Sequence, residues 1–198
     1  MSTLTTAAEI DSPPRFTQET LAWVPWVEPL DEAELTERHY EGLVQRPRAK
    51  NPYFRLLARD PEVLGARTKT DLDIFYNTAD GLGRAERELG AAVASRSNGC
   101  VYCASVHSAF ATHFSTRGDD VQRLLDEGVA ADLGDEAWNA VRDAVVALTA
   151  TPVRFGAEHV EALHAAGLDD AAVLDVINSG AFFNWANRLM LSLGEPSL

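Results

Sequence analysis

Two cysteines stand three positions apart in this chain, and a histidine follows the second of them by four positions. They are Cys100, Cys103 and His107, and the sequence has no other cysteine. The pair Asn98-Gly99 breaks the preceding helical pattern, so a new helix is expected to begin at about Cys100. The first turn of a helix has free N–H groups and a partial positive charge, which stabilise a thiolate and lower the pKa of a cysteine. The spacing therefore predicts a reactive thiol pair.

Helical geometry predicts where these groups point. Cys100, Cys103 and His107 share one face at i, i+3 and i+7, and Phe110 and Phe114 continue it, so we expect the thiols to face inward. One helical turn also brings two sulfurs near enough for a disulfide. His107 lies one turn beyond Cys103, within reach of a hydrogen bond or a one-water relay, and an imidazole exchanges protons near neutral pH.

Glu88 is the acidic group that could join this constellation. It precedes Cys100 by twelve positions, which is roughly 18 Å along one straight helix and too far for contact. If the two helices fold back on each other at Asn98-Gly99, Glu88 comes level with His107 or Cys103. The face of Glu88 carries small residues that let the next helix approach closely, and a carboxylate there would orient the imidazole. The other residues of this face are Arg84, Ala85, Ala91, Ala92 and Ser95.

The elements that position these residues are predicted to be helices almost throughout. Few runs alternate with period two, and none is framed by hairpin signals, so the fold class is all-α. Asp31, Asp60, Asp135 and Asp169 are the expected N-caps. Helices are expected over residues 31–46, 52–57, 61–76, 84–96, 100–114, 118–127, 135–150, 157–166 and 169–193, with Gly180 as the weak point of the last.

The chain divides into an arm and one body. Residues 1–30 form an N-terminal arm, because Pro13-Pro14, Pro25 and Pro29 break any helix there. Its apolar stretch 23–27 is expected to dock on its own domain rather than on a neighbouring subunit. Residues 31–198 show no linker and are expected to form a single all-α domain.

Composition excludes some partners. The 198 residues include 30 acidic and 17 basic side chains, for a net charge of −13. Such a charge repels nucleic acid and anionic lipid, so neither is expected as a partner. No apolar run is long enough to cross a bilayer, and residues 1–16 do not read as a secretory signal, so a cytoplasmic location is expected.

The spacing Glu-x11-Cys-x2-Cys-x3-His, formed by Glu88, Cys100, Cys103 and His107, resembles the signature of the alkylhydroperoxidase D-like proteins of the carboxymuconolactone decarboxylase superfamily. The stretch from Gly167 to Arg188 is similar to the closing helix of that family. The resemblance covers about residues 50–193 and is greatest to the longer, peroxidase-related branch, which has an extra N-terminal arm.

The resemblance implies an all-α helical bundle, assembly into trimers or hexamers, and thiol-dependent reduction of hydroperoxides without a cofactor or a metal. It implies that Cys103 attacks the peroxide and becomes a sulfenic acid, which Cys100, nearer the helix end and more exposed, converts to a disulfide. Glu88 and His107 would form the proton relay. The disulfide would be reduced by a dithiol or a lipoylated partner protein.

Other functions stay open on the sequence. Some family members have a second histidine where this chain has Tyr102, and a phenol cannot act as a base at neutral pH, which leaves general disulfide reductase chemistry as an alternative. A non-catalytic, redox-sensing helical assembly module is another. The thiols could also be inert core residues, or hold a structural zinc with His107 and Glu88, although zinc usually has four Cys or His ligands.

The remaining aromatic and basic residues are assigned plainer roles. Asn184 and Arg188, one turn apart, are expected to buttress the core or meet a carboxylate. The histidines outside the motif are expected at the surface: His39, His113, His159 and His164. The aromatic residues expected in the core or at a subunit interface are Trp138, Phe182, Phe183 and Trp185.

Overall fold

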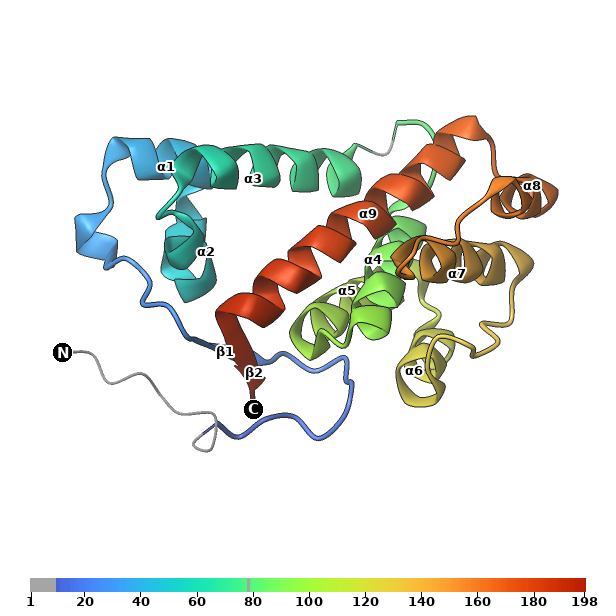
Figure 1. The fold of residues 1–198 in the computed structure, drawn as a ribbon, viewed down its shortest axis with the longest axis horizontal. Helices are drawn as coiled ribbons and strands as arrows, with labels where there is room; N and C mark the ends of the chain where they lie inside the picture. The colour runs from blue at the N-terminus through green and yellow to red at the C-terminus, as the bar shows by residue number, and fades with distance from the viewer. Residues whose placement is uncertain (1–9, 78) are drawn as a thin grey trace.

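The computed structural model describes residues 10–77 and 79–198, and these residues form an all-α fold, as predicted. The longest helix, α9, crosses the middle of the molecule, with α1 to α3 on one side and α6 to α8 on the other (Figure 1). The α-helices within the described residues are α1 (Glu37–Leu43), α2 (Pro52–Leu57), α3 (Pro61–Tyr76), α4 (Arg84–Asn98), α5 (Val101–Ser115), α6 (Gly118–Glu127), α7 (Glu136–Thr149), α8 (Ala157–Ala165) and α9 (Asp170–Leu193).

A helical hairpin, α4 and α5, carries the cysteine motif. Gly99 ends α4 with φ of +78°, a left-handed conformation that glycine adopts without a steric penalty. Cys100 is the N-cap of α5, and its backbone N–H donates to the carbonyl of Ser95. The chain therefore reverses at Asn98-Gly99, as the sequence predicts, and α5 packs along α4.

Helix α9 packs closely on α4 and α7 because small residues lie at both contacts. A Cβ atom added to Gly90 of α4 would lie 3.0 Å from the hydroxyl oxygen of Ser179 on α9. A Cβ atom added to Gly180 would lie 3.1 Å from Leu148 Cδ2 on α7. The expected weak point at Gly180 is wrong, since α9 is continuous there and the missing side chain makes room for α7.

The predicted helix over residues 31–46 is wrong. Asp31 caps only the short 3-10 helix η2 (Glu32–Glu34), and α1 begins later, after Thr36. Val44 then ends α1 with φ of +62°, a conformation that a helix cannot contain. A second 3-10 helix, η3 (Arg46–Lys50), follows. Three short segments therefore replace one helix.

The described part of the arm lies along its own domain. Strand β1 (Ala22–Pro25) pairs antiparallel with strand β2 (Gly194–Ser197), which directly follows α9. Gln18 accepts a hydrogen bond of 2.6 Å from the Thr112 hydroxyl of α5. The arm thus contacts both the C-terminal strand β2 and helix α5. The sequence predicts that the arm begins at residue 1, but residues 1–9 lie outside the described residues.

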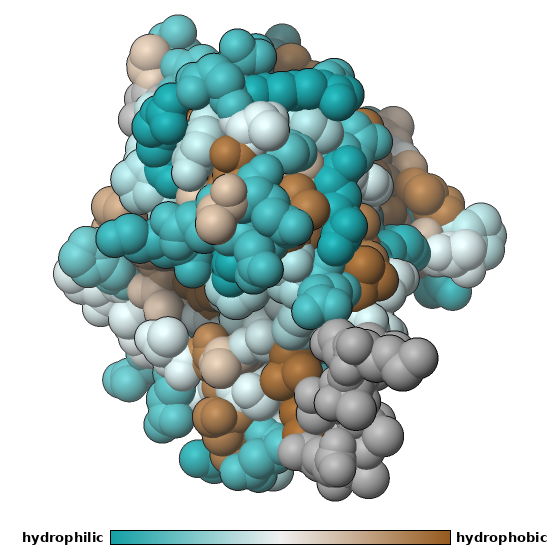
Figure 2. Space-filling model, turned by 90° about the vertical axis from the view of Figure 1, so that its left-hand side faces the viewer, coloured by the Kyte–Doolittle hydropathy of each residue, from teal (hydrophilic) through white to brown (hydrophobic). Residues whose placement is uncertain are grey.

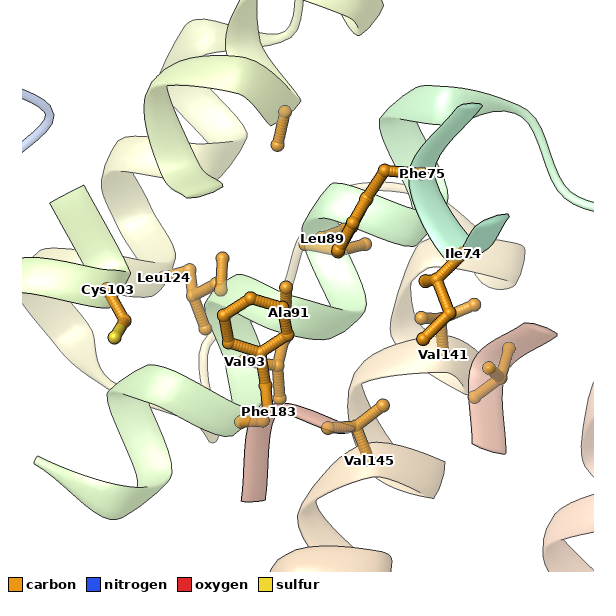
Figure 3. Packing of buried hydrophobic residues seen from close by; sticks show 14 of the residues in the cluster. Ile74, Phe75, Leu89, Ala91, Val93, Cys103, Leu124, Val141, Val145 and Phe183 are labelled. Carbon is orange, nitrogen blue, oxygen red and sulfur yellow. The ribbon is translucent and has the colours of Figure 1, made fainter. Parts of the chain in front are cut away.

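The core lies where α4 meets α5, α7 and α9. Figure 3 shows Leu89 and Val93 of α4 among side chains from the surrounding helices, and Cys103 belongs to the same buried cluster. The face over the α1–α2 end is mostly hydrophilic, with small separate apolar patches (Figure 2). No helix in the described ranges is both long and apolar enough to cross a membrane.

Candidate redox site

Both cysteines are buried free thiols at the start of α5. Cys103 is 6% exposed and lines a cavity, whereas Cys100 is only 1% exposed. The expectation that Cys100 is the more exposed is therefore wrong. The segment just before α5 is held against α9, because the Asn98 side chain donates a hydrogen bond of 2.9 Å to the Asn184 side chain. Being nearer the helix end thus gives Cys100 no access to solvent.

The two thiols differ in their tendency to ionise. The hydrogen bond from the Cys103 thiol lowers the pKa of Cys100, and the Cys103 backbone N–H and Asn187 act in the same direction. The same hydrogen bond, burial and the charge of Cys100 raise the pKa of Cys103 well above its ordinary value. The first thiolate of the pair therefore forms on Cys100, and the prediction of a lowered pKa applies to one cysteine only.

Glu88 of α4 forms a hydrogen bond with His107 of α5, as expected if the two helices fold back on each other. Oε2 of Glu88 lies 2.5 Å from Nδ1 of His107, and the carboxylate is fully buried. The other oxygen, Oε1, accepts a hydrogen bond of 2.6 Å from Nε of Arg84. A buried carboxylate needs such partners. Glu88 therefore holds an imidazole with one oxygen and a guanidinium with the other.

Two aromatic rings hold the imidazole of His107 in place. The ring centroid of Phe183 is 4.1 Å from that of His107 in an edge arrangement, and Phe75 stacks at 5.4 Å. Among the residues that the structure describes, no hydrogen bond joins His107 to either thiol. A proton passing between His107 and Cys103 would therefore travel through a water or a substrate.

A cavity of about 290 Å³ lies beside these groups and is lined by Cys103, His107 and Glu88. Phe110 also lines it, but Phe110 is 42% exposed and Phe114 is 47% exposed. The expectation that these two rings continue the buried face is wrong. Helix α4 begins at Arg84, so no further turn of α4 covers this end of α5, where the Arg84 guanidinium lies over both rings.

The sequence analysis did not single out Asn187, which contacts the thiol pair. Its side chain lowers the pKa of both thiols and lies 3.0 Å from the Ser95 hydroxyl oxygen. Asn187 is fully buried in α9 between Phe183 and Met190, which are also buried. A polar residue within an apolar stripe of helical spacing is a signal that could have identified it.

Tyr102, which directly precedes Cys103, lines the same cavity. Burial raises the pKa of Tyr102, so the phenolate, the form that could act as a base, is still scarcer at neutral pH than in water. No group of three or more Cys, His, Asp or Glu side chains within residues 10–77 and 79–198 is arranged to hold a metal ion. The zinc site considered from the sequence therefore has no ligand set among these residues.

Apart from Phe183, the remaining singled-out residues do not line the cavity. Arg188 is exposed and donates to the Asn184 carbonyl on its own helix, so it does not line the cavity. Trp138 and Phe183 are buried, Phe182 is half-buried and Trp185 is exposed. Of the other histidines, His113 and His164 are exposed, whereas His39 and His159 are half-buried and accept backbone N–H bonds at helix starts.

Comparison with solved structures finds the same fold in peroxidase-related proteins. The alkylhydroperoxidase AhpD core of an uncharacterized peroxidase-related protein from Ralstonia eutropha has a TM-score of 0.72 at 21% identity, covering 85% of this chain and 90% of that one. An uncharacterized peroxidase-related protein from a Silicibacter species has a TM-score of 0.68 at 23% identity, covering 86% and 92%.

A third solved structure with this fold has a different activity. The debrominase Bmp8 has a TM-score of 0.67 at 18% identity, covering 84% of this chain and 88% of that one. A Cys-to-Ala variant of that debrominase has been solved in complex with 2,3,4-tribromopyrrole. No curated protein sequence matches the chain significantly. The fold thus occurs in enzymes of more than one activity.

The carboxymuconolactone decarboxylase family matches the chain over residues 61–147, which include α4, α5 and the whole cysteine motif. This match and the AhpD-like fold confirm the resemblance recognised in the motif. Residues 61–147 accordingly match the carboxymuconolactone decarboxylase family, in a chain with the AhpD-like fold.

Proposed function

We propose that this protein is a thiol-dependent peroxidase that reduces hydroperoxides through Cys103 and Cys100. The single observation that carries the proposal is that Cys103 lines the same cavity as the hydrogen-bonded pair Glu88 and His107. A peroxide in that cavity would meet a sulfur nucleophile and an imidazole together. The family match and the peroxidase-related structures support the same reaction class.

The first step oxidises Cys103. Its proton moves along the existing hydrogen bond to the Cys100 thiolate, so that Cys103 becomes the nucleophile. The Cys103 sulfur attacks the terminal peroxide oxygen, an S–O bond forms and the O–O bond breaks. The alkoxide leaves and takes the Nε2 proton of His107, which His107 received when the Cys100 thiolate formed and which Glu88 helps it to hold. The products are the alcohol and a Cys103 sulfenic acid.

The second step closes the disulfide and returns the enzyme. Cys100 loses a proton and attacks the Cys103 sulfur, an S–S bond forms, and hydroxide leaves with that proton as water. An external dithiol then reduces the disulfide by exchange and is itself oxidised to a disulfide. We propose a small dithiol or a lipoylated protein as this reductant. We further propose that the enzyme is a cytoplasmic trimer or hexamer.

The test is peroxide consumption by the purified protein with dihydrolipoamide as the electron donor. Wild type is expected to turn over many times, and Cys103→Ser to abolish consumption. Cys100→Ser is expected to complete one turnover and to accumulate a sulfenic acid, detectable by mass after trapping with dimedone. Full activity of Cys103→Ser would reject the assignment.

The same samples separate the alternatives. A general disulfide reductase would reduce a small aromatic disulfide with dihydrolipoamide but consume no peroxide. A redox-sensing assembly module would form the Cys100–Cys103 disulfide reversibly, with no turnover of either substrate. Each of these outcomes would replace the peroxidase proposal.

A further inference from the structure

Two arginines in the wall of the cavity have no role in the proposed redox steps. They are Arg48 of η3 and Arg67 of α3, and both line the cavity that Cys103 lines. Three guanidinium groups and two carboxylates face this cavity, the others being Arg84, Asp71 and Glu88. The wall therefore holds three guanidinium groups against two carboxylates in a chain whose net charge is −13.

Arg48 and Arg67 share one carboxylate and are poorly satisfied by it. Asp71 Oδ2 lies 3.2 Å from Arg67 Nη1 and 3.7 Å from Arg48 Nη2. Their side chains are only 8% (Arg67) and 15% (Arg48) exposed. Nε of Arg67 and Nη1 of Arg48 are buried without a hydrogen-bond partner among the described residues, and the contact of Arg67 Nη1 with Asp71 lacks hydrogen-bond geometry. A buried donor that is left without a partner destabilises the fold.

Aromatic rings fix the positions of both guanidinium groups. Arg48 lies 4.8 Å above the centroid of the Phe54 ring, and Arg67 lies 5.4 Å from that of Phe182. Burial and the charge of Arg67 lower the pKa of Arg48, while Asp71 partly offsets them. Two cations are thus held close together and desolvated, with one anion between them. A second anion at this place would satisfy the unpaired donors and balance the charge.

We propose that the cavity binds an organic hydroperoxide that carries a carboxylate, and that Arg48 and Arg67 bind this carboxylate. The inference rests on the proposed peroxidase function and names its substrate class. The apolar part of the substrate lies against Phe75, Phe183 and Met190, which line the same cavity, and the peroxide group meets Cys103. A volume of about 290 Å³ suits a compact molecule rather than a long acyl chain.

The first experiment measures binding without chemistry. The probe is para-isopropylbenzoate, which has no peroxide group, titrated by calorimetry into the reduced wild-type protein, with its methyl ester as the uncharged analogue. The carboxylate is expected to bind at least about tenfold more tightly than the ester, the effect of one charge-assisted hydrogen bond. Equal affinities for the two probes would overturn the proposal.

Matched arginine variants test the residues. Arg48→Gln is expected to weaken binding of the carboxylate about tenfold or more and to remove the preference over the ester, whereas Arg48→Lys restores part of it. Arg48 is the better choice because Arg67 also affects the pKa of Cys103 through its charge. Arg38→Gln, which alters an exposed arginine outside the cavity, serves as control and is expected to bind like wild type. An unchanged preference in Arg48→Gln would overturn the assignment.

The second experiment measures turnover with cumene hydroperoxide bearing a para-carboxylate and with its methyl ester. The ratio of kcat/KM, acid over ester, is expected to exceed about ten in wild type and to fall towards one in Arg48→Gln. Equal kcat/KM for the two substrates would overturn the carboxylate subsite while leaving the peroxidase intact. Binding of para-isopropylbenzoate without consumption of either hydroperoxide would overturn the peroxidase function while leaving the subsite.

Discussion

The Nδ1 atom of His107 and the Oε2 atom of Glu88 lie 2.5 Å apart across the hairpin of α4 and α5. This contact leaves Nε2 as the only ring nitrogen that can act on a molecule in the cavity. It also fixes the ring plane, which Phe183 and Phe75 support from two other helices. The predictions below follow from this contact and from its neighbours.

Replacing Glu88 by Gln is expected to lower kcat/KM for a hydroperoxide roughly tenfold to hundredfold, because a positioned acid–base group contributes at least that much. The neutral amide can still accept one hydrogen bond but cannot balance a protonated imidazole. Peroxide consumption across the pH range measures the effect, and the shape of the profile should change with the rate. The control is Glu136→Gln, at an exposed position of α7. A wild-type rate and profile in Glu88→Gln would remove Glu88 from the relay.

Replacing Arg84 by Ala is expected to lower the free energy of unfolding by about 3 kcal/mol, since it takes a cation away from a buried carboxylate. Arg38→Ala removes an exposed ion pair with Glu62 and is expected to cost about 1 kcal/mol or less. Urea denaturation at neutral pH compares the two variants. Equal losses would mean that Arg84 does not compensate the charge of Glu88.

The thiol pair is expected to release its first proton below the ordinary pKa of cysteine, because the pKa of Cys100 is lowered. A lowered pKa means that the thiolate is present at lower pH. Cys103→Ala removes the main hydrogen bond to Cys100 and should move the midpoint upward, whereas Cys103→Ser keeps a hydroxyl donor and should move it less. Ultraviolet absorbance of the thiolate measures each midpoint. A midpoint that stays in place in Cys103→Ala would contradict the assigned cause.

Replacing Phe183 by Leu is expected to lower kcat several-fold with little change in KM, because the ring that packs against His107 is lost. The loss of stability should stay below about 1.5 kcal/mol, as for other hydrophobic exchanges of similar size. Phe155→Leu is the control, since the Phe155 ring stacks on His159 and does not line the cavity. If both variants lower kcat equally, the effect does not come from the contact with His107.

Much of the fold follows from local signals. Asp60, Asp135 and Asp169 each accept a hydrogen bond from the backbone N–H three residues ahead, as N-caps do, and the helices begin where these residues predict. The prediction of one helix over residues 31–46 is wrong because a capping box at Asp31 fits a single 3-10 turn as well as a long helix. Nothing in the pattern of this stretch marks the positive φ of Val44.

The candidate site was only partly predictable. A turn at Asn98-Gly99 is a local feature, and it alone brings Glu88 to His107. Helical periodicity assigned Phe110 to the right face, but it does not say how far the neighbouring helix extends over that face. Arg48 and Arg67 lie on two segments far from the motif in sequence, and only tertiary packing brings them to the cavity.

The pairing of β1 with β2 joins residues 22–25 to residues 194–197. During synthesis on the ribosome the arm has no strand to pair with until residues 194–197 have emerged. The hairpin that carries the thiols is complete long before then, because its contacts are local in sequence. Removal of residues 194–198 should therefore spare the folding of the hairpin but release the arm, so that limited proteolysis would cleave first within residues 10–30.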